Sequence, residues 1–216
     1  MSVGAAMRLV LASNNAKKLL ELRALFDGLP LELVPQGQLG IPEAEEPHLT
    51  FLENALAKAR QAARASGGAA MADDSGVCVE ALGGAPGVIS AHFAEVSTAG
   101  AGDREAQRRV QDAANNALLL QRLAGCTDRR AAFVSTLVAL RHADDPQPLV
   151  AFGRWPGRIL EAPSGGGGFG YDPLMFIPDL GATVAELDAA TKNAQSHRAR
   201  AAAQMRQLLQ EAWSLG

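Results

Sequence analysis

Two adjacent carboxylates follow a short run of small apolar residues in the segment MADDSG, residues 71–76. Neighbouring carboxylates repel each other, so a chain that places Asp73 beside Asp74 must provide for both charges. Side chains alternate along a strand, and we therefore expect the two carboxylates to point to different faces. One of them would bind a metal ion or act as a base, while the other would orient the Ser75-Gly76 turn expected after the strand. An Asx turn without catalytic function is the alternative.

A second acid could share a metal ion with one of these aspartates. Glu46 lies in the loop expected over residues 36–48, which also contains Glu43 and Glu45. Proteins bind Mg²⁺ through few carboxylates, with water molecules and substrate phosphates completing its coordination. The sequence therefore indicates a Mg²⁺ site made by Glu46 and one of the two aspartates.

Positive charges occur where they could bind phosphate. The segment SNNAKK, residues 13–18, opens an expected helix, where free backbone N–H groups and the helix dipole attract phosphate. A capped surface helix with solvated lysines is the alternative. Lys58 lies at the edge of the apolar stripe of the helix expected over residues 50–66. It either meets an anionic partner in a cleft or extends its ammonium to solvent.

A glycine-rich loop, SGGGGFGYDP at residues 164–173, formally contains the pattern G-x-G-x-x-G. A dinucleotide site would need a helix directly after the glycines, whereas a strand is expected here. Glycines let a ligand come close to the backbone, so Phe169 could be a stacking platform. A flexible hairpin is the alternative.

The start of the last expected helix, over residues 192–213, is rich in cations. Lys192, His197 and Arg198 surround Ser196, which could cap the helix. Positive charge is unfavourable beside a helix N-terminus, so this arrangement suggests a bound anion or ligand. A histidine with a purely structural role is the alternative.

The composition argues against several classes of protein. The 216 residues carry a net charge of −3, so a broad basic surface for nucleic acid is not expected. Cys78 and Cys126 have neither metal spacing nor a disulfide pattern, which is typical of reduced thiols in a cytoplasmic protein. We expect no signal peptide and no membrane-spanning segment. We expect a single domain over residues 1–216.

The elements that must position these residues follow from hydrophobic periodicity and from capping and turn residues. Strands are expected over residues 8–12, 31–34, 69–72, 131–141, 149–153, 158–161 and 174–177. Helices are expected after the capping residues 13–15 as far as Gly28, and over residues 50–66, 103–123 and 192–213. This order predicts an α/β fold with a mixed central sheet.

Several segments resemble, in sequence and in order, the inosine triphosphate pyrophosphatase family, also called Ham1-like or non-canonical purine NTP pyrophosphatases. They are SNNAKK, EEPHLTFLENALAKA, ADDSGVCVEALGGAPG, GGFGYDP and KNAQSHR, and the resemblance extends from Leu9 to Leu209. It implies an α/β fold with a long curved mixed sheet and two lobes around a cleft. It also implies a homodimer that uses Mg²⁺ to hydrolyse ITP, dITP and XTP to monophosphate and pyrophosphate, which removes non-standard purines from the nucleotide pool.

The resemblance also implies roles for particular residues. Asp74 is implied as the proton acceptor and, together with Glu46, as a ligand of the metal ion. The implied substrate-binding residues are Ser13, Asn14, Asn15, Ala16, Lys17, Lys18, Lys58, Ser75, Phe169, Gly170, Tyr171, Asp172, Lys192, His197 and Arg198. Of these, Phe169 would stack on the base, and Lys192, His197 and Arg198 would reach the base side. The implied partner is a purine nucleoside triphosphate, with neither nucleic acid nor membrane.

The sequence departs from the family pattern at two places. Many relatives carry arginine where His92 stands, and residues 95–114 are longer and less typical than the usual acidic linker. The resemblance implies that Met7 corresponds to the usual start, and we therefore expect residues 1–6 to be a short N-terminal extension. Two alternative functions are a Maf-type pyrophosphatase of other base specificity and a nucleotide-binding protein without catalysis. The motifs GGFGYD and SHR disfavour the former, and the acids Glu46 and Asp74 disfavour the latter.

Overall fold

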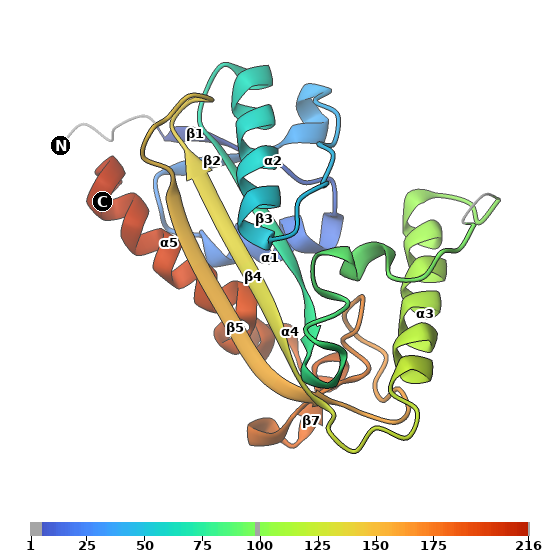
Figure 1. Cartoon of the computed structure of the whole chain (residues 1–216). Helices are drawn as coiled ribbons and strands as arrows, with labels where there is room; N and C mark the ends of the chain where they lie inside the picture. Colours follow the sequence, from blue (N-terminus) through green and yellow to red (C-terminus); the bar gives the residue numbers. More distant parts are fainter. Residues whose placement is uncertain (1–5, 98–99, 216) are drawn as a thin grey trace. The chain divides into compact units, whose positions relative to one another are not determined.

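The structure, a computed structural model, describes residues 6–97 and 100–215 (Figure 1). The chain divides into two compact units. The first comprises Met1–Asp74, Ser135–Arg154 and Asn193–Gly216, and the second comprises Ser75–Val134 and Trp155–Lys192. That residues 1–216 form a single domain therefore remains a prediction. Of the predicted N-terminal extension, residues 1–5 lie outside the described residues.

The strands form one sheet with the order β2-β1-β3-β4-β5-β6-β7. The strands are β1 (Met7–Leu11), β2 (Leu31–Pro35), β3 (Ala70–Val79), β4 (Arg130–Leu140), β5 (Leu149–Ile159), β6 (Met175–Ile177) and β7 (Ala182–Thr183). Strand β1 pairs in parallel with β2 and β3, whereas β6 pairs antiparallel with β5 and β7. The predicted α/β fold with a mixed sheet is therefore confirmed.

The helices are α1 (Ala16–Leu25), α2 (Phe51–Ser66), α3 (Arg104–Arg122), α4 (Ala189–Gln195) and α5 (His197–Trp213). Short 3-10 helices stand at Gln36–Leu39, Glu80–Leu82, Gly87–His92, Pro178–Leu180 and Val184–Glu186. Side chains cap the starts of two long helices, and the cap at Thr50 is the one that the spacing of Thr50 and Glu53 predicts. Thr50 accepts the N–H of Glu53 at 3.2 Å at the start of α2, and Asp103 accepts the N–H of Ala106 at 2.8 Å at the start of α3.

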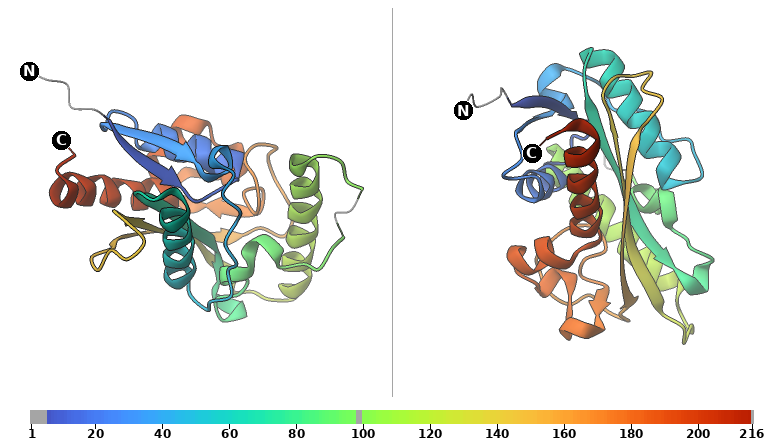
Figure 2. Two further views of the ribbon diagram at one scale, coloured as in Figure 1. Left: turned by 90° about the horizontal axis from the view of Figure 1, so that it is seen from above. Right: turned by 90° about the vertical axis from the view of Figure 1, so that its left-hand side faces the viewer.

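In the first unit, helices pack on both faces of the sheet, with α2 on one face and α5 on the other (Figure 2). Alternate side chains of a strand point to opposite faces. Leu9, Leu11 and Met71 consequently pack in one apolar cluster with side chains of α1 and α5. Ala70 and Ala72 pack in another, with alanines of α2. The helix that a residue of β3 meets is therefore decided by whether its number is odd or even.

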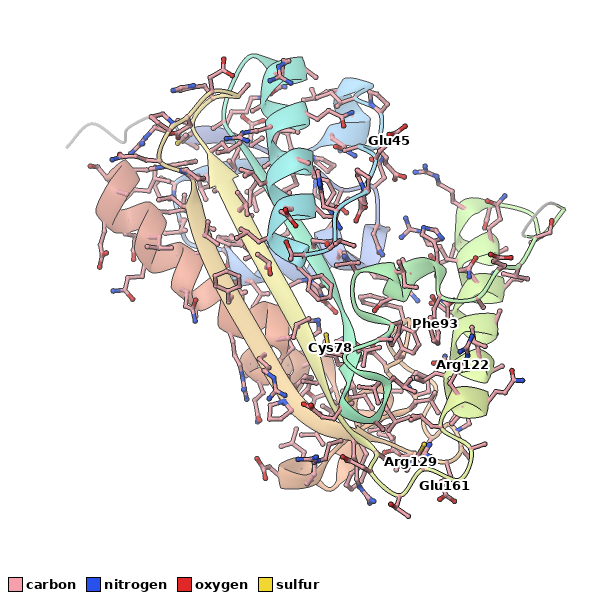
Figure 3. All side chains as sticks on the ribbon, in the orientation of Figure 1. Glu45, Cys78, Phe93, Arg122, Arg129 and Glu161 are labelled. Carbon is pink, nitrogen blue, oxygen red and sulfur yellow. The ribbon has the colours of Figure 1, made fainter. Side chains whose placement is uncertain are left out.

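The second unit has its own apolar core, which contains Val77, Leu119, Phe133, Trp155 and Leu174. The guanidinium of Arg129 joins the end of α3 to the end of β5 (Figure 3). It donates to the carbonyl oxygens of Leu123 at 3.1 Å, Ile159 at 2.7 Å and Leu160 at 2.8 Å. These bonds tie the C-terminal end of α3 to the end of β5.

The strand predicted over residues 69–72 is wrong in its extent, because β3 continues through both aspartates to Val79. Ser75 and Gly76 consequently form no turn. Gly76 serves close packing instead, since a Cβ there would overlap the side chain of Ser90 and the carbonyl of Gly87. The two aspartates therefore lie inside a strand, which fixes the direction of both side chains.

Other element boundaries also differ from the predictions. Strand β5 is unbroken from Leu149 to Ile159 and contains Pro156, whereas two strands were predicted, over residues 149–153 and 158–161. The last predicted helix is interrupted at Ser196, which separates α4 from α5 and accepts the N–H of Ala199 at 3.1 Å. The short strand β7 has no counterpart among the predicted elements. Every helix in the described ranges is too short or too polar to cross a membrane.

Candidate active site

Asp73 belongs to the first unit, and its side chain lies on the face of β3 that carries the odd-numbered residues. It is buried at the centre of a group of polar side chains, here called the Asp73 hub. Its carboxylate binds Lys18 Nζ of α1 at 3.0 Å, Arg198 Nη2 of α5 at 3.0 Å and Ser135 Oγ of β4 at 2.6 Å. Burial opposes ionisation, but Arg198 and Lys18 outweigh it and hold the pKa of the Asp73 carboxyl well below its ordinary value. Asp73 is therefore an anion throughout the physiological pH range, and its oxygens hold other side chains in place.

Arg198 is 1% exposed, and two carboxylates bind its guanidinium. One is Asp73, and the other is Glu21 of α1, which pairs with Nη1. Helix α5 reaches this position because it packs closely on β5, where a Cβ at Gly153 would overlap the carbonyl of His197. The contacts of Arg198 are those of a residue that positions Asp73, and its predicted approach to the purine base stays a prediction.

Asp74 lies on the even-numbered face of β3, where α2 packs. Lys58 Nζ of α2 lies 2.8 Å from Asp74 Oδ1 and 3.1 Å from Glu46 Oε2. Burial opposes the charge of Lys58, but Asp74 and Glu46 outweigh it and raise the pKa of this ammonium. The anionic partners predicted for Lys58 are confirmed, and the alternative of a solvated lysine is wrong.

Asp74 and Glu46 share Lys58 but titrate differently. Burial raises the pKa of Asp74 to about 6, and the neighbouring Glu46 carboxylate adds to this effect while Lys58 opposes it. Burial also acts to raise the pKa of Glu46, but Lys58 outweighs it and the net shift is downward. Asp74 Oδ2 is buried and has no hydrogen-bond partner among the described residues. The pKa of Asp74 therefore lies near neutral pH, and its Oδ2 accepts no hydrogen bond from the described residues.

Asp74 and Glu46 are two acids that a cation at this position could use. Within residues 6–97 and 100–215, no group of three or more His, Cys, Asp or Glu side chains is arranged to hold a metal ion. A cation here would therefore use few protein ligands, which is the coordination that Mg²⁺ accepts when a substrate supplies phosphate oxygens.

The predicted phosphate-binding turn is built around Asn15. Asn15 Oδ1 accepts the N–H groups of Lys17 at 3.1 Å and Lys18 at 3.2 Å, and the N–H of Asn15 donates to Ser13 Oγ at 3.2 Å. The predicted capping of α1 is confirmed. The cap uses the N–H groups of Lys17 and Lys18, two of the backbone donors that were expected to bind phosphate. Burial lowers the pKa of the Lys18 ammonium despite its contact with Asp73, so Lys18 is not the solvated lysine of the alternative.

The other residues of this turn frame the cap. Asn14 contacts the backbone at Gly37, where a Cβ would overlap Asn14 Oδ1. Ala16 is the exposed first residue of α1. The turn and α1 thus bring polar side chains of residues 13–18 to one end of β1, in the first unit.

A further group of predicted site residues lies in the second unit, in the glycine-rich loop. The N–H of Phe169 donates to Asp172 Oδ2 at 2.9 Å, and Lys192 Nζ donates to the same oxygen at 2.8 Å. The Lys192 ammonium also lies 4.6 Å from the centre of the Phe169 ring. Gly168 makes this possible, because its φ is +74° and a Cβ would overlap the Asp172 carboxylate. Phe169, Asp172 and Lys192 therefore form one connected group.

The remaining predicted residues have different surroundings. Tyr171 is buried and donates through its hydroxyl to the Ser90 carbonyl at 2.9 Å. Burial, with a smaller effect of the Asp112 charge, raises the pKa of Tyr171, so its hydroxyl stays a donor. Ser75 is half-buried on β3 in the second unit, and His197 is buried at the start of α5 in the first.

Sequence reasoning missed four polar residues that contact predicted ones. They are Glu21 and Ser135, which join the Asp73 hub, and Asp112 and Asn116 of α3, which bind the backbone of Gly170. Three of them left a spacing signal. Glu21 follows Lys18 by three residues on α1, and Asp112 precedes Asn116 by four on α3, so each pair shares a helix face. Ser135 left no signal, because only the sheet brings β4 beside β3.

Comparison with known proteins identifies the family. Residues 9–208 match the Ham1 family. The chain is 70% identical over 207 residues to a dITP/XTP pyrophosphatase of Methylibium petroleiphilum, a match covering 96% of this chain and 99% of that one. It is 64% identical to a dITP/XTP pyrophosphatase of Leptothrix cholodnii, covering 97% of this chain and all of the relative.

Solved structures agree with this result. A HAM1 protein of Coxiella burnetii superimposes with a TM-score of 0.83 at 38% identity, covering 95% of this chain and 99% of that one. The Ham1 protein of Staphylococcus aureus superimposes with a TM-score of 0.79 at 33% identity, again covering 95% and 99%. By sequence over almost its whole length and by fold, the chain belongs to the Ham1 family.

Proposed function

We propose that this chain is a nucleoside triphosphate pyrophosphatase that hydrolyses dITP, XTP and ITP to the nucleoside monophosphate and pyrophosphate. The name that its 70% and 64% identical relatives bear supports this substrate class. The observation that carries the chemistry is the cluster of Asp74, Lys58 and Glu46, which combines a carboxylate of raised pKa with a buried ammonium. A protein that only binds nucleotides would have no need for a base of this kind.

Asp74 is the acid suited to accept a proton. Its pKa of about 6 leaves it largely ionised at pH 7 to 8 while keeping it basic enough to take a proton from an attacking water. Asp73 is unsuited to this role, because two cations hold its pKa well below the ordinary value. Lys18 and Lys58 would stabilise the negative charge that develops on the phosphates as pyrophosphate leaves.

The same carboxylates fit Mg²⁺. Asp74 Oδ2 is a buried oxygen without a partner in the described part of the chain, and the Glu46 side chain is 43% exposed. Together with substrate phosphates and water they would satisfy the coordination of this ion. Mg²⁺ bound by Asp74 and Glu46 would neutralise phosphate charge and help to activate water. Lys58, which contacts both acids, would hold their carboxylates in place for the ion.

The group around Phe169 would recognise the base. Its ring offers a face for stacking, and Lys192 beside it carries only hydrogen-bond donors. A donor favours the 6-oxo group of hypoxanthine and xanthine and opposes the 6-amino group of adenine. A site that depends on such hydrogen bonds discriminates by up to about 10⁴. GTP also carries the 6-oxo group, so its exclusion would depend on the 2-amino group.

We further propose that the enzyme is a homodimer and acts in the cytoplasm, as the family resemblance implies. The exposed Leu20, Leu49 and Phe152 are compatible with burial of surface between subunits.

A panel of nucleoside triphosphates tests the proposed function. ITP, dITP, XTP, GTP and ATP are each incubated with the protein and Mg²⁺, and pyrophosphate and orthophosphate are measured separately. We expect pyrophosphate from the first three, and none of them to react in EDTA. Stepwise release of orthophosphate would overturn the reaction, and comparable kcat/KM values for ATP and ITP would overturn the base preference. Preference for a pyrimidine or a modified base would favour a Maf-type activity.

A further inference from the structure

Two side chains of α3 hold the backbone of Gly170, the residue directly after Phe169. Asp112 Oδ2 accepts the N–H of Gly170 at 2.8 Å, and Asn116 Nδ2 donates to the carbonyl oxygen of Gly170 at 2.9 Å. Asp112 and Asn116 are four residues apart on α3, so they lie one above the other on the same face of the helix. All of these residues belong to the second unit. We call this pair the α3 clamp.

The α3 clamp completes the fixation of Phe169. The peptide that precedes its Cα is held through the Phe169 N–H, which donates to Asp172 at 2.9 Å. The peptide that follows its Cα is held through the Gly170 N–H, which donates to Asp112 at 2.8 Å. Because both flanking peptide planes are fixed, the φ and ψ angles of Phe169 are fixed as well. The direction in which its ring leaves the backbone is therefore set by two carboxylates.

The loop itself has little means of keeping this geometry. Gly168 and Gly170 both have positive φ values, of +74° and +60°, and glycine visits many other conformations at small cost. The loop lies between β5 and β6 and contains no strand of its own. External hydrogen bonds must therefore select the one conformation that presents Phe169.

Helix α3 is a rigid support for the clamp. Its C-terminal end is tied to β5 through Arg129, as described above. At its middle, Asn115 donates to the carbonyl oxygens of Ser90 and Ala91 at 3.2 Å each and accepts the N–H of Ala94 at 2.8 Å. These bonds anchor α3 between the two clamp residues and at the C-terminal end beyond them.

Asparagine at position 116 is unfavourable for the stability of α3, and its bond to Gly170 gives a reason for its presence. Asparagine is a poor helix former, and Asn116 Oδ1 is buried without a hydrogen-bond partner among the described residues. An apolar side chain would avoid both penalties. What asparagine contributes at this position is the donor to the Gly170 carbonyl.

We propose that Asp112 and Asn116 are positioning residues for base recognition, which act on the purine through the backbone of Gly170 and the ring of Phe169. The inference rests on the proposed function, since it assumes that Phe169 stacks on the base. Asp112 lies within residues 95–114, in which this sequence departs from the family pattern, and Asn116 follows two residues after that segment on the same helix. Neither residue touches the substrate itself.

Kinetics of clamp variants test this role. Asp112→Ala and Asn116→Ala should each raise KM for ITP by about tenfold, the effect of one lost hydrogen bond, and should lower kcat less than they raise KM. Asp112→Asn keeps an acceptor for the Gly170 N–H and should recover most of the loss. Asp103→Ala is the matched control, because it removes an aspartate of the same helix that caps α3 and does not bind the loop. It should leave KM within about twofold.

A double-mutant cycle separates positioning from general destabilisation. If Asp112 acts through Phe169, then Asp112→Ala should have little further effect on KM once Phe169→Ala has removed the ring. Independent, multiplying effects of the two changes on KM would overturn the inference. So would an Asp112→Ala variant whose KM for ITP equals that of the wild type.

A measurement without substrate keeps this test apart from that of the proposed function. In ¹⁵N–¹H spectra of the full chain, the Gly170 amide should exchange slowly with solvent in the wild type and in Asp103→Ala. It should exchange at least about tenfold faster in Asp112→Ala. Equal protection in both variants would show that the clamp does not hold the loop. If the amide responds as expected but the wild type releases no pyrophosphate, the clamp stands and the proposed function fails.

Discussion

Asp73 and Asp74 are neighbours on β3, yet their carboxylates bind lysines of different helices: Asp73 contacts Lys18 of α1, and Asp74 contacts Lys58 of α2. The alternation of side chains along a strand places them on opposite faces of the sheet. One face gives a carboxyl group whose pKa is well below its ordinary value, and the other gives one whose pKa is about 6. Two identical side chains thus become a permanent anion and a carboxyl group that titrates near pH 6.

The first prediction concerns catalysis. Asp74→Asn keeps the shape of the side chain but removes its charge and its ability to accept a proton. Turnover should fall by about 10² or more, while ITP binding in equilibrium titrations stays measurable. Near-normal kcat in this variant would exclude Asp74 as the base.

The second prediction concerns stability and pH in the absence of metal. The pKa of Asp74 rises from 3.8 to about 6 on folding, so between these values the folded state keeps a proton that the unfolded state has lost. Stability therefore decreases as pH rises through this window and then levels off, at a cost of about 3 kcal/mol in total. Asp74→Asn lacks this titration.

Urea unfolding in EDTA at several pH values measures this effect. Relative to the wild type, Asp74→Asn should become progressively more stable between pH 4 and pH 7, and the difference should stay constant above pH 7. A difference that does not change with pH would show that Asp74 titrates normally in the fold.

The third prediction concerns Lys18. Replacing it by alanine removes an ammonium from the predicted phosphate-binding turn and leaves Asp73 with Arg198 and Ser135 as partners. Affinity for ITP should fall by about 1.5–3 kcal/mol, the value of a hydrogen bond to a charged group, while affinity for inosine changes little. Calorimetric titration with both ligands decides the matter. Equal losses for the two would indicate a folding defect instead.

The fourth prediction concerns Arg198. Because this guanidinium is buried against two carboxylates, Arg198→Ala leaves Asp73 and Glu21 without their shared partner. The free energy of unfolding should decrease by about 3–5 kcal/mol, the usual result of breaking a buried ion pair. Denaturant unfolding beside Arg200→Ala, a change at an exposed arginine of the same helix, provides the comparison. If Arg198→Ala is as stable as that control and loses the preference for ITP over ATP, Arg198 is a base contact after all.

Local signals predicted most of the secondary structure. Helix α2 could be predicted from its apolar spacing and from Thr50, and the structure confirms both. The wrong element boundaries occur at residues whose local preference differs from the conformation that tertiary packing requires. Gly76 resembles a turn residue but lies in β3 because Ser90 packs against it, and Pro156 resembles a strand breaker but lies within β5. The conformational preference of the single residue does not decide the structure at these positions, because close packing with distant segments outweighs it.

The sequence by itself determined which chemical groups are available: adjacent carboxylates, lysines at helix positions, and an aromatic ring among glycines. The sequences of these motifs and their order along the chain were enough to indicate the family by resemblance. Only the tertiary structure decided what each group does. Asp73 and Asp74 differ because α1 and α5 pack on one face of β3 and α2 packs on the other. Asp112 reaches Gly170 across 58 residues of chain, and no local pattern specifies such a contact, because it depends on how separate elements pack.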